Sequence, residues 1–422
     1  MTNRAPNHRW RLVLVLGIAT LLSLSGDLTL YAILPVDAGG LPLTLAQVGV
    51  LLSANRFVRL FSNPLTGYLL DRGKRRPIYL SGMLLGTLST LIYAHTRLFG
   101  VLLIGRLVWG FAWSFINVGG TTMVVDSTQP SDRGRFLGIL NLMLSLGLAL
   151  NPLIGGFLAD AVGFRPTMLF CALLTGTGFL LTVFLLPETR PDPTEKSPHK
   201  DLPNAPLTPA TSRPAWLTRL RGFDPRVLGW GTWLAIFLTL ILFFAGNGLI
   251  MATIGRFLAL EVAGGVTVWG TFLGISALTG MALSTRSLLI GVAAPLSGAF
   301  SDRGHSRWPA VLIGLGFGAA GMLALGGLPT APALVVGISL IAVGEGVLLT
   351  VLPAIVGDGT PLSQRGRAMG LTFVAGDLGS ALAPLLVYSL LALIPLRTVY
   401  LASAGAFGLG IMLVILRIVN SE

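Results

Sequence analysis

Seven ionisable side chains fall inside long apolar stretches of this 422-residue sequence, a position that each of them needs a reason to occupy. At the centre of a lipid bilayer a charged side chain costs about 3 kcal/mol or more, so it is normally paired, hydrated or functional. Intramembrane acids and bases are typical of proton relays and of paths for ions or polar molecules. The seven are three acids and four arginines: Asp27, Glu345, Asp377, Arg56, Arg59, Arg106 and Arg286.

Helical spacing arranges many of these residues into polar stripes, with members three or four positions apart. Because a polar stripe turns away from lipid, the three most polar stretches are expected to line one cavity in the first half of the chain. Asp377 has a weaker stripe and Glu345 has little polar company. For Arg56, Arg286 and Glu345, a static salt bridge that fixes helix packing is an equal alternative. The three stripes are Thr20, Ser23, Asp27 and Tyr31; Asn55, Arg59 and Asn63; and Arg106, Gly110, Trp113 and Asn117.

The composition indicates that these charges belong to a membrane protein. Hydrophobic residues make up 53% of the chain and charged residues 11%, with a mean hydropathy of +0.80, whereas a soluble domain carries about 25% charged residues. The net charge of +12 could suggest nucleic acid, but the cations flank the apolar stretches and form no basic domain, so we expect no nucleic-acid partner. The single cysteine, Cys171, excludes an intramolecular disulfide. The four histidines are scattered, so the sequence predicts neither a metal site nor a cofactor.

Twelve apolar runs are long enough to cross a bilayer as helices, which takes about 20 residues each. They predict an all-α membrane protein with two six-helix bundles, 1–187 and 227–422. A proline-rich linker, 188–226, joins the bundles. The runs are 12–36, 47–70, 77–96, 99–123, 135–159, 164–186, 227–252, 268–300, 308–328, 331–356, 366–391 and 396–416.

The distribution of Lys and Arg predicts the orientation of these helices, because cytoplasmic loops retain cations. If the N-terminus lies inside, 21 of the 29 Lys and Arg are cytoplasmic and four lie inside the spans. Both termini, the linker and the loop after the second span are therefore expected in the cytoplasm of a multi-pass protein of the cell membrane. The four cations expected outside are Arg97, Arg165, Arg256 and Arg397.

The two halves repeat one another. The segment "NPLTGYLLDRGKRRP" at 63–77 is matched by "APLSGAFSDRGHSRWP" at 294–309, and "SDRGRFLGILNLMLSLGLALNP" at 131–152 aligns without gaps on "SQRGRAMGLTFVAGDLGSALAP" at 363–384. Asp126 and Asp358 end the fourth and tenth spans in similar contexts, and are expected to be gate or cap residues. Duplicated six-helix units are typical of secondary transporters, whose substrates bind between the repeats near the membrane midplane.

The loop after the second span resembles the most general signature of the major facilitator superfamily, and the resemblance extends over essentially the whole chain. The signature combines a glycine, an aspartate, a second glycine and several cations. Here the second glycine follows the first arginine directly, one residue earlier than usual, and the copy in the second half is shortened in the same way. The first copy consists of Gly67, Asp71, Arg72, Gly73, Lys74, Arg75 and Arg76, and the second includes Gly298, Asp302 and Arg303.

Two further patterns resemble subgroups of that family. Arg106 with Gly110 resembles the helix 4 pattern of proton-coupled members. A set in helix 5 resembles the pattern of exporters that exchange substrate for protons, although Asn151 stands where that pattern has glycine. Ordinary close packing of helices, with no bearing on the direction of transport, is the alternative for these small residues. The helix 5 set is Gly138, Gly147, Asn151, Pro152, Gly155 and Gly156.

The resemblance implies a secondary transporter that rocks its two halves around a central site and uses protons to export small amphipathic molecules. An importer or facilitator of an organic anion is a close alternative, because four intramembrane arginines face three acids. A lipid flippase is also open, whereas a membrane enzyme or sensor is disfavoured by the absence of GK[ST], HExxH and GxSxG motifs. The expected partners are a small-molecule substrate, protons and the lipid bilayer, and the expected unit is a monomer.

Asp27 is the predicted main proton-coupling residue, with Asp377 and Glu345 as the other candidates. Burial would raise its pKa and a nearby Arg59 or Arg106 would lower it, so movement could switch its protonation. The resemblance further implies that Asp71 contacts the N-terminus of helix 11, near Arg365 and Gly366, when the transporter opens outward. The predicted substrate cavity consists of Tyr31, Asn55, Arg59, Arg106, Trp113, Asn117 and Asn247.

Overall fold

The computed structural model describes residues 6–36, 41–129, 131–190, 228–262, 264–268, 270–301, 306–328, 331–361 and 364–420. Most of the predicted linker, together with Asp302 and Arg303 of the second loop motif, lies outside these residues. The first half is built from α1 (Pro6–Ser23), α2 (Ser25–Ile33), η1 (Leu34–Val36), α3 (Leu45–Arg72), α4 (Arg75–His95), α5 (Phe99–Ser127), α6 (Arg133–Val162) and α7 (Phe164–Leu185).

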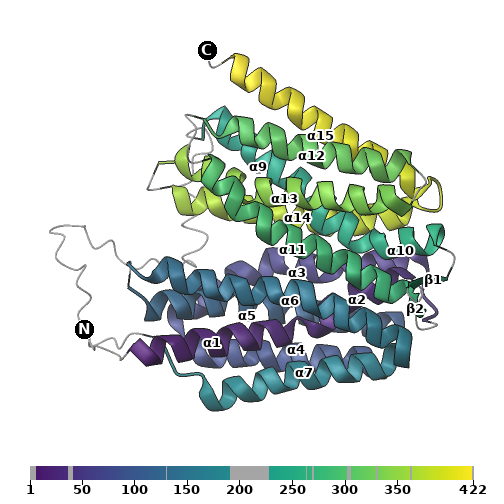
Figure 1. Ribbon diagram of the computed structural model, residues 1–422. Coiled ribbons are helices and arrows are strands. Elements are labelled where there is room, and N and C mark those ends of the chain that lie inside the picture. Colours follow the sequence, from purple (N-terminus) through teal and green to yellow (C-terminus); the bar gives the residue numbers. More distant parts are fainter. Residues whose placement is uncertain are drawn as a thin grey trace.

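The second half repeats this order and adds a small hairpin. Figure 1 shows it stacked on the first half, with the helices of both halves running the length of the molecule. Its elements are α9 (Trp230–Phe243), the π-helix η3 (Phe244–Ile250), α10 (Met251–Glu261), β1 (Gly265–Val268), β2 (Thr271–Gly274), α11 (Ile275–Ser301), α12 (Trp308–Gly327), α13 (Ala331–Asp358), α14 (Arg365–Leu390) and α15 (Leu396–Val419).

The helices confirm the predicted two-bundle membrane fold. Among the described residues, eleven spans are long and apolar enough to cross a membrane. The twelfth crossing is α3, whose 28 residues are long enough but carry several charges, among them Arg56, Arg59 and Asp71. A capping box fixes its start, because the N–H of Gln47 donates to the Thr44 hydroxyl and the N–H of Thr44 donates to the Gln47 amide oxygen.

The first helix of each half is irregular at matching places. The first predicted span is divided between α1 and α2 at Leu24, and the seventh contains η3, which includes Asn247. Aligning "SGDLTL" at 25–30 with "AGNGLI" at 245–250 puts Asp27 opposite Asn247. Short π-helical segments inside α-helices are often found at functional sites.

The predicted span 268–300 is wrong at its start, because α11 begins only at Ile275. The preceding residues form the antiparallel pair β1 and β2, with Val266 opposite Leu273 and Thr267 opposite Phe272. β-Branched and aromatic residues favour strands, and Gly270 adopts the positive φ of 78° that a tight turn requires. Apolar content alone did not distinguish this hairpin from the start of a helix.

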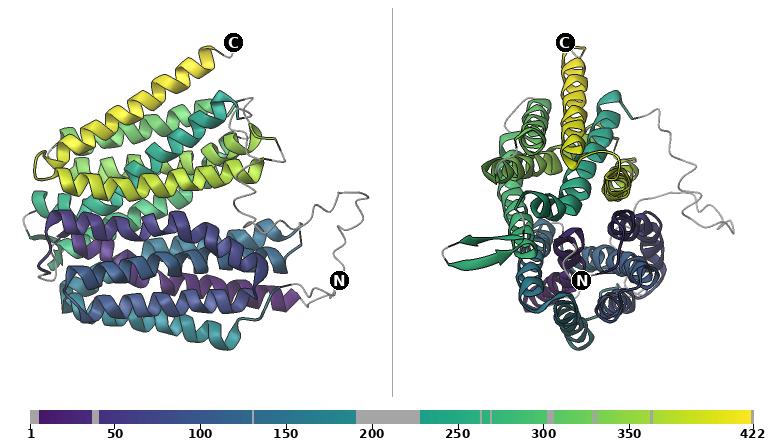
Figure 2. Two further views of the ribbon diagram at one scale, coloured as in Figure 1. Left: turned by 180° about the vertical axis from the view of Figure 1, so that it is seen from behind. Right: turned by 90° about the vertical axis from the view of Figure 1, so that its right-hand side faces the viewer.

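The hairpin marks one end of the molecule and the basic loop after α3 marks the other. In Figure 1, β1 and β2 lie at the right, whereas α1 begins and α15 ends at the left; Figure 2 shows the same arrangement from behind. We call these the hairpin end and the basic end.

Two matching crossings join the halves toward the hairpin end. A Cβ on Gly280 of α11 would lie 2.2 Å from the carbonyl oxygen of Pro152 in α6, and one on Gly49 of α3 would lie 2.7 Å from that of Pro384 in α14. Continuing the alignment of 63–77 on 294–309 upstream without gaps pairs Gly49 with Gly280, and the second pair of segments aligns Pro152 with Pro384. Each half thus contributes one glycine and one proline to an equivalent close approach, where a side chain would not fit. We call these the glycine–proline crossings.

The same four helices have open space toward the basic end. Six of their glycines would meet no atom within 4 Å if they carried a Cβ. The close approaches of glycine between the halves thus lie toward the hairpin end, and these six glycines make none. The six are Gly67, Gly134, Gly138, Gly291, Gly366 and Gly370.

Candidate functional site

The first polar cluster lies beside the break between α1 and α2. Asp27 forms an ion pair with Arg106 of α5, and the Asn55 side-chain amide donates to the same carboxylate oxygen at 3.3 Å. Arg106 is 1% exposed, and it also donates from Nε to the Leu51 carbonyl at 2.8 Å and from Nη2 to the Tyr31 hydroxyl at 3.4 Å. Of the two arginines predicted near Asp27, Arg106 is its ion-pair partner.

The second polar cluster lies in the other half. Arg286 of α11 donates to both carboxylate oxygens of Glu345 in α13 at 2.6 Å, and the Asn247 side-chain amide donates to one of them at 3.2 Å. Asn247 lies in the π-helix, next to Gly246, where a Cβ would come within 2.7 Å of the Glu345 carboxyl group. Glycine at that position lets the carboxylate approach the backbone.

The two clusters use equivalent helices with their chemical roles exchanged. Each cluster contains one acid, one arginine and one asparagine. On the first, second and fourth helices of its half, the first cluster has Asp27, Asn55 and Arg106, and the second has Asn247, Arg286 and Glu345. Asn55 and Arg286 lie twelve residues before the matching glycines Gly67 and Gly298, so an amide in the first half replaces an arginine in the second. Asn247 likewise occupies the position of Asp27. Duplication preserved the location of the clusters but not the location of each charge.

A third ion pair connects the halves. Arg59 of α3 pairs with Asp377 of α14, and the Asn63 amide donates to the other Asp377 oxygen at 3.2 Å. Ser114 of α5 donates to the Asn63 side-chain oxygen at 2.7 Å, which ties this bridge to the first cluster's helix. The predicted cavity residue Arg59 is thus part of the junction between the halves.

The two remaining predicted cavity residues, Trp113 and Asn117, lie on α5, as does Trp109. The rings of Trp109 and Trp113 are 6.2 Å apart. Trp109 is 2% exposed and packs in the core, whereas Trp113 is half-buried and Asn117 is exposed. Of these three, Trp113 and Asn117 are accessible to a ligand.

Five of the six helix 5 residues pack α6 against its neighbours, whereas a Cβ on Gly138 would meet no atom within 4 Å. The Asn151 amide donates to the Leu21 carbonyl at 2.9 Å, close to the break after α1. Gly147 faces Leu21 and Leu24 of the first span, and a Cβ on Gly155 would overlap the Thr29 side chain at 2.0 Å. On the other side of the helix, Pro152 and Gly156 face α11, where a Cβ on Gly156 would lie 2.2 Å from the Ser276 carbonyl oxygen. These residues let α6 approach both α2 and the second half.

The basic loop stabilises the first half internally. Arg75 pairs with Asp126 at the end of α5, with 3.0 Å between Nε and the carboxylate. The Arg76 guanidinium donates to the Val183 carbonyl of α7 at 2.5 Å. Arg72 stacks over the Tyr68 ring at 4.2 Å, while Gly73 ends α3 in an extended conformation.

Asp71 is exposed, and it makes no hydrogen bond or ion pair with any residue that the structure describes. The predicted contact with the start of α14, near Arg365 and Gly366, is therefore absent from this conformation. Open space beside Gly67 and Gly366 agrees with that separation.

In the second copy of the loop motif, Gly298 packs against Thr350 of α13, where a Cβ would lie 3.3 Å from the threonine methyl group. Arg307 Nε pairs with Asp358 at 2.8 Å, as Arg75 pairs with Asp126 in the first half. Asp302 and Arg303 are among the residues that the structure does not describe.

Sequence reasoning missed Glu188, which caps α4. Its carboxylate accepts the backbone N–H groups of Arg75 at 2.9 Å and Arg76 at 3.2 Å, as well as those of Thr189 and Arg190. Partial burial acts to raise the pKa of Glu188, but the four N–H donors outweigh it, so the pKa lies below its usual value. The available signal was an acid just after the apolar run 164–186, the last of the first half, together with two arginines just before the run 77–96.

Asp160 was also missed. Its carboxylate accepts the Ala277 N–H at 2.8 Å, so an acid of the first half caps the start of α11 in the second. A Cβ on Gly274 would lie 2.3 Å from that carboxylate, so glycine leaves room for it. Asp160 follows Gly156 by one helical turn, and that spacing could have placed it at the same seam.

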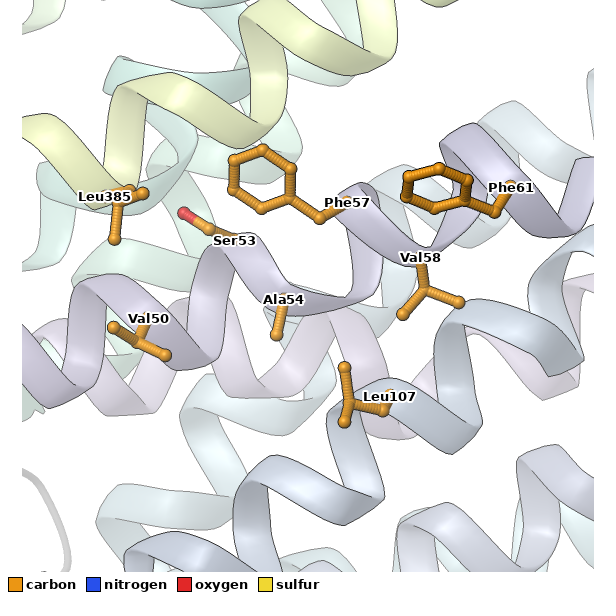
Figure 3. Close-up of a pocket in the computed structure, with 8 residues that line it drawn as sticks. All are labelled: Val50, Ser53, Ala54, Phe57, Val58, Phe61, Leu107 and Leu385. Atoms are coloured by element: carbon orange, nitrogen blue, oxygen red, sulfur yellow. The ribbon is translucent and has the colours of Figure 1, made fainter.

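The described residues form no metal site, and one apolar pocket among them carries no charge. Among the described residues, no cluster of three or more His, Cys, Asp or Glu could hold a metal ion. Figure 3 shows a pocket of about 330 Å³ on the flank of α3, lined by side chains without charge, including Phe57, Phe61, Leu107 and Leu385. Its lining suits apolar groups, and the charged chemistry lies in the three ion pairs described above.

One family model matches the sequence over most of its length, and individual relatives match shorter parts of it. The family model described as Major Facilitator Superfamily matches residues 16–284 and 257–422. The tetracycline resistance protein, class C, of Escherichia coli is 30% identical over 167 residues, which is 40% of either chain. The quinolone resistance protein NorA of Staphylococcus aureus is 27% identical over 154 residues, 36% of this chain and 39% of NorA. The chain thus aligns with about two fifths of the length of these relatives.

Solved structures resemble the fold over almost the whole chain. A bacterial homologue of the human lysosomal transporter Spinster, in an inward-facing and unoccupied conformation, has a TM-score of 0.69 at 15% identity and covers 98% of this chain and 96% of its own. The peptide transporter POT in complex with sulfate has a TM-score of 0.75 at 17% identity, with coverages of 96% and 93%. At such low identity the likeness concerns the fold alone.

Proposed function

The chain belongs to the Major Facilitator Superfamily, and from that premise we propose that it is a secondary transporter that exports small amphipathic molecules in exchange for protons. The observation that carries this proposal is the buried Asp27–Arg106 pair beside the break in the first span. A carboxylate that is paired in one conformation and separated in another changes its proton affinity, which couples movement to protonation. The relatives named as tetracycline and quinolone resistance proteins support export as the direction.

We assign the conformation as open to the cytoplasm, with the basic end on the cytoplasmic side. The excess of cations at that end supports the orientation, and the tight crossings at the hairpin end support closure on the outside. In the exchange cycle, substrate enters from the basic end, the halves rock, and protonation of Asp27 from the outside accompanies substrate release. Asp71 then meets the start of α14 in the outward-open state.

The test is transport by the purified protein in liposomes with an imposed pH gradient, with internal pH recorded and chemically distinct substrates screened. Asp27→Asn should abolish gradient-driven accumulation and its pH dependence while leaving downhill exchange within about threefold of the native rate. Glu261→Gln is a matched control, because it neutralises an acid in the exposed pair with Arg397. Full gradient-driven accumulation by Asp27→Asn would refute the assignment and make Asp377 the next residue to test.

A further inference from the structure

Four arginines lie within the spans, and three of them have a carboxylate of their own. Arg106, Arg59 and Arg286 pair with Asp27, Asp377 and Glu345, respectively. The fourth, Arg56, is only 9% exposed and forms an ion pair with no residue that the structure describes. Its side chain interacts with that of Tyr31 and donates weakly from Nη2 to the Met251 sulfur at 3.9 Å.

Arg56 lies within electrostatic reach of all three buried acids. It interacts electrostatically with Asp27 and Asp377 and with Glu345, each of which already has an arginine. Its neighbours come from both halves, because Tyr31 belongs to the first and Met251 to the second. Four arginines against three acids leave one positive charge at the centre, and that charge is on Arg56.

Within the part of the chain that the structure describes, several buried guanidinium N–H groups at the centre have no acceptor, and there the amide oxygen of Asn55 has no donor. The Nε–H groups of Arg56, Arg59 and Arg286 have no acceptor among the described residues. A guanidinium carries five N–H donors and no acceptor, so only an added acceptor can satisfy it. An unpaired buried charge destabilises a protein, whereas a hydrogen-bonded anion would compensate it.

We propose that Arg56 binds the anionic group of the transported molecule, which makes the substrate an organic anion with an apolar body. The carboxylate, sulfonate or phosphate of such a molecule supplies the missing charge and the missing acceptors. The Met251 thioether beside the guanidinium suits an apolar body, since methionine adapts to varied shapes. This inference rests on the proposed role as a transporter, and it does not depend on proton coupling.

A second cation, Arg256, lies toward the hairpin end. A cavity of about 240 Å³ lies there between the halves, and its lining includes Leu34, Val48, Tyr388 and Arg256. Arg256 is half-buried and forms no ion pair with a described residue. An anion released from Arg56 toward that end would therefore meet another positive charge before it reached water.

The first experiment compares three ligands that differ only in their polar group: phenylbutyrate, phenylbutyramide and phenylbutylamine. Stabilisation of the purified native protein against heat is measured as each is added. Phenylbutyrate should raise the apparent Tm, and the neutral amide and the cationic amine should not. Stabilisation by the amide or the amine to the same extent, or by none of the three, would overturn the anionic assignment. Equal stabilisation by chloride would assign the site to an inorganic ion and would also overturn it.

The second experiment uses variants of Arg56. Arg56→Gln should weaken phenylbutyrate binding at least tenfold, or about 1.4 kcal/mol at 25 °C. Arg56→Lys should bind with intermediate affinity, because it keeps the charge but not the planar fork. Unchanged binding by Arg56→Gln would contradict the proposal.

Stability without ligand separates a binding role from a structural one. Arg56→Gln removes an unpaired charge, so its apparent Tm should equal or exceed that of the native protein. The matched variant Arg286→Gln strands Glu345 and should lower the Tm. A Tm of Arg56→Gln as low as that of Arg286→Gln would show a structural role. Because these measurements need no pH gradient, an anion-selective site would stand even if Asp27→Asn still accumulated substrate.

Discussion

Each buried carboxylate faces one arginine, and the three pairs differ in what they connect. Asp27–Arg106 and Glu345–Arg286 lie within a half, whereas Arg59–Asp377 lies between the halves. In a low dielectric, losing one partner costs more than losing both, because the remaining charge stays buried and uncompensated. Substituting one residue of a pair therefore tests how strongly the pair is buried as well as whether it functions in transport.

The first prediction compares single and double variants of the first cluster. Arg106→Gln leaves Asp27 charged and buried and should lower the free energy of unfolding by about 3–5 kcal/mol. The double variant Asp27→Asn, Arg106→Gln should regain most of that loss. Thermal unfolding of the purified proteins at neutral pH measures both. A double variant less stable than the single one would mean that the cluster holds α2 and α5 together by more than charge.

The second prediction concerns Glu188, whose pKa is lowered in the folded protein. A lowered folded pKa stabilises the fold at pH values above the unfolded pKa of about 4.3, and the contribution disappears as pH falls through the folded pKa. Glu188→Gln should cost about 1 kcal/mol at neutral pH, the typical value of a helix cap. The difference from the native protein should vanish in strong acid. A difference that is constant with pH would exclude the carboxylate as the cause.

At the scale of the elements, the glycine–proline crossings explain why four helices meet where they do. A glycine on the second helix of each half leaves room for the carbonyl oxygen of a proline on the fifth helix of the other half. Proline bends the helix and leaves the carbonyl four residues earlier without its helical N–H; at Pro152 this is the Leu148 carbonyl, which accepts the Ser287 hydroxyl of α11 at 3.2 Å. At the crossing itself, glycine supplies the room. Equivalent residues therefore close the hairpin end at two places.

The third prediction adds one methyl group to a crossing. Gly280→Ala would place its Cβ 2.2 Å from the Pro152 oxygen, so it should destabilise the conformation closed at the hairpin end. Spin labels at two exposed sites, one in each half at the hairpin end, should report longer distances in this variant. Gly408→Ala, where a Cβ meets nothing within 4 Å, is the matched control. Unchanged distances in Gly280→Ala would mean that the crossing does not limit opening.

Much of the helical architecture could be predicted from the sequence, for physical reasons. Apolar runs of membrane length predicted the spans, and the duplicated segments predicted two bundles. The stripe on helix 1 predicted polar neighbours for Asp27, and Asn55 and Arg106 lie beside it. The partners were not predictable, since Arg59 and Arg106 both lay within plausible reach of Asp27. Tertiary packing decides between them, as it does for Glu188 and Asp160, whose partners are distant in the chain.

At the scale of the whole molecule, the orientation of the two ends in the membrane is the fourth prediction. In a Cys171→Ala background, a cysteine at Lys74 in the basic loop should react with an impermeant thiol reagent only after cells are opened. A cysteine at Gly270 in the hairpin turn should react in intact cells. Both positions are exposed, so poor access cannot explain a difference. The reverse pattern would invert the proposed orientation and the assignment of the open side.

Among the ion pairs between described residues, Arg59–Asp377 is the one that joins the two halves, and this bears on speed. Any movement that separates α3 from α14 must first break it, so the pair contributes to the activation barrier of the conformational change. Each reduction of about 1.4 kcal/mol in that barrier makes the step tenfold faster. A proton on Asp377 removes the attraction between the two side chains. Protonation of Asp377 would therefore set how many times per second the molecule changes shape, even if the affinity for substrate on either side stayed the same.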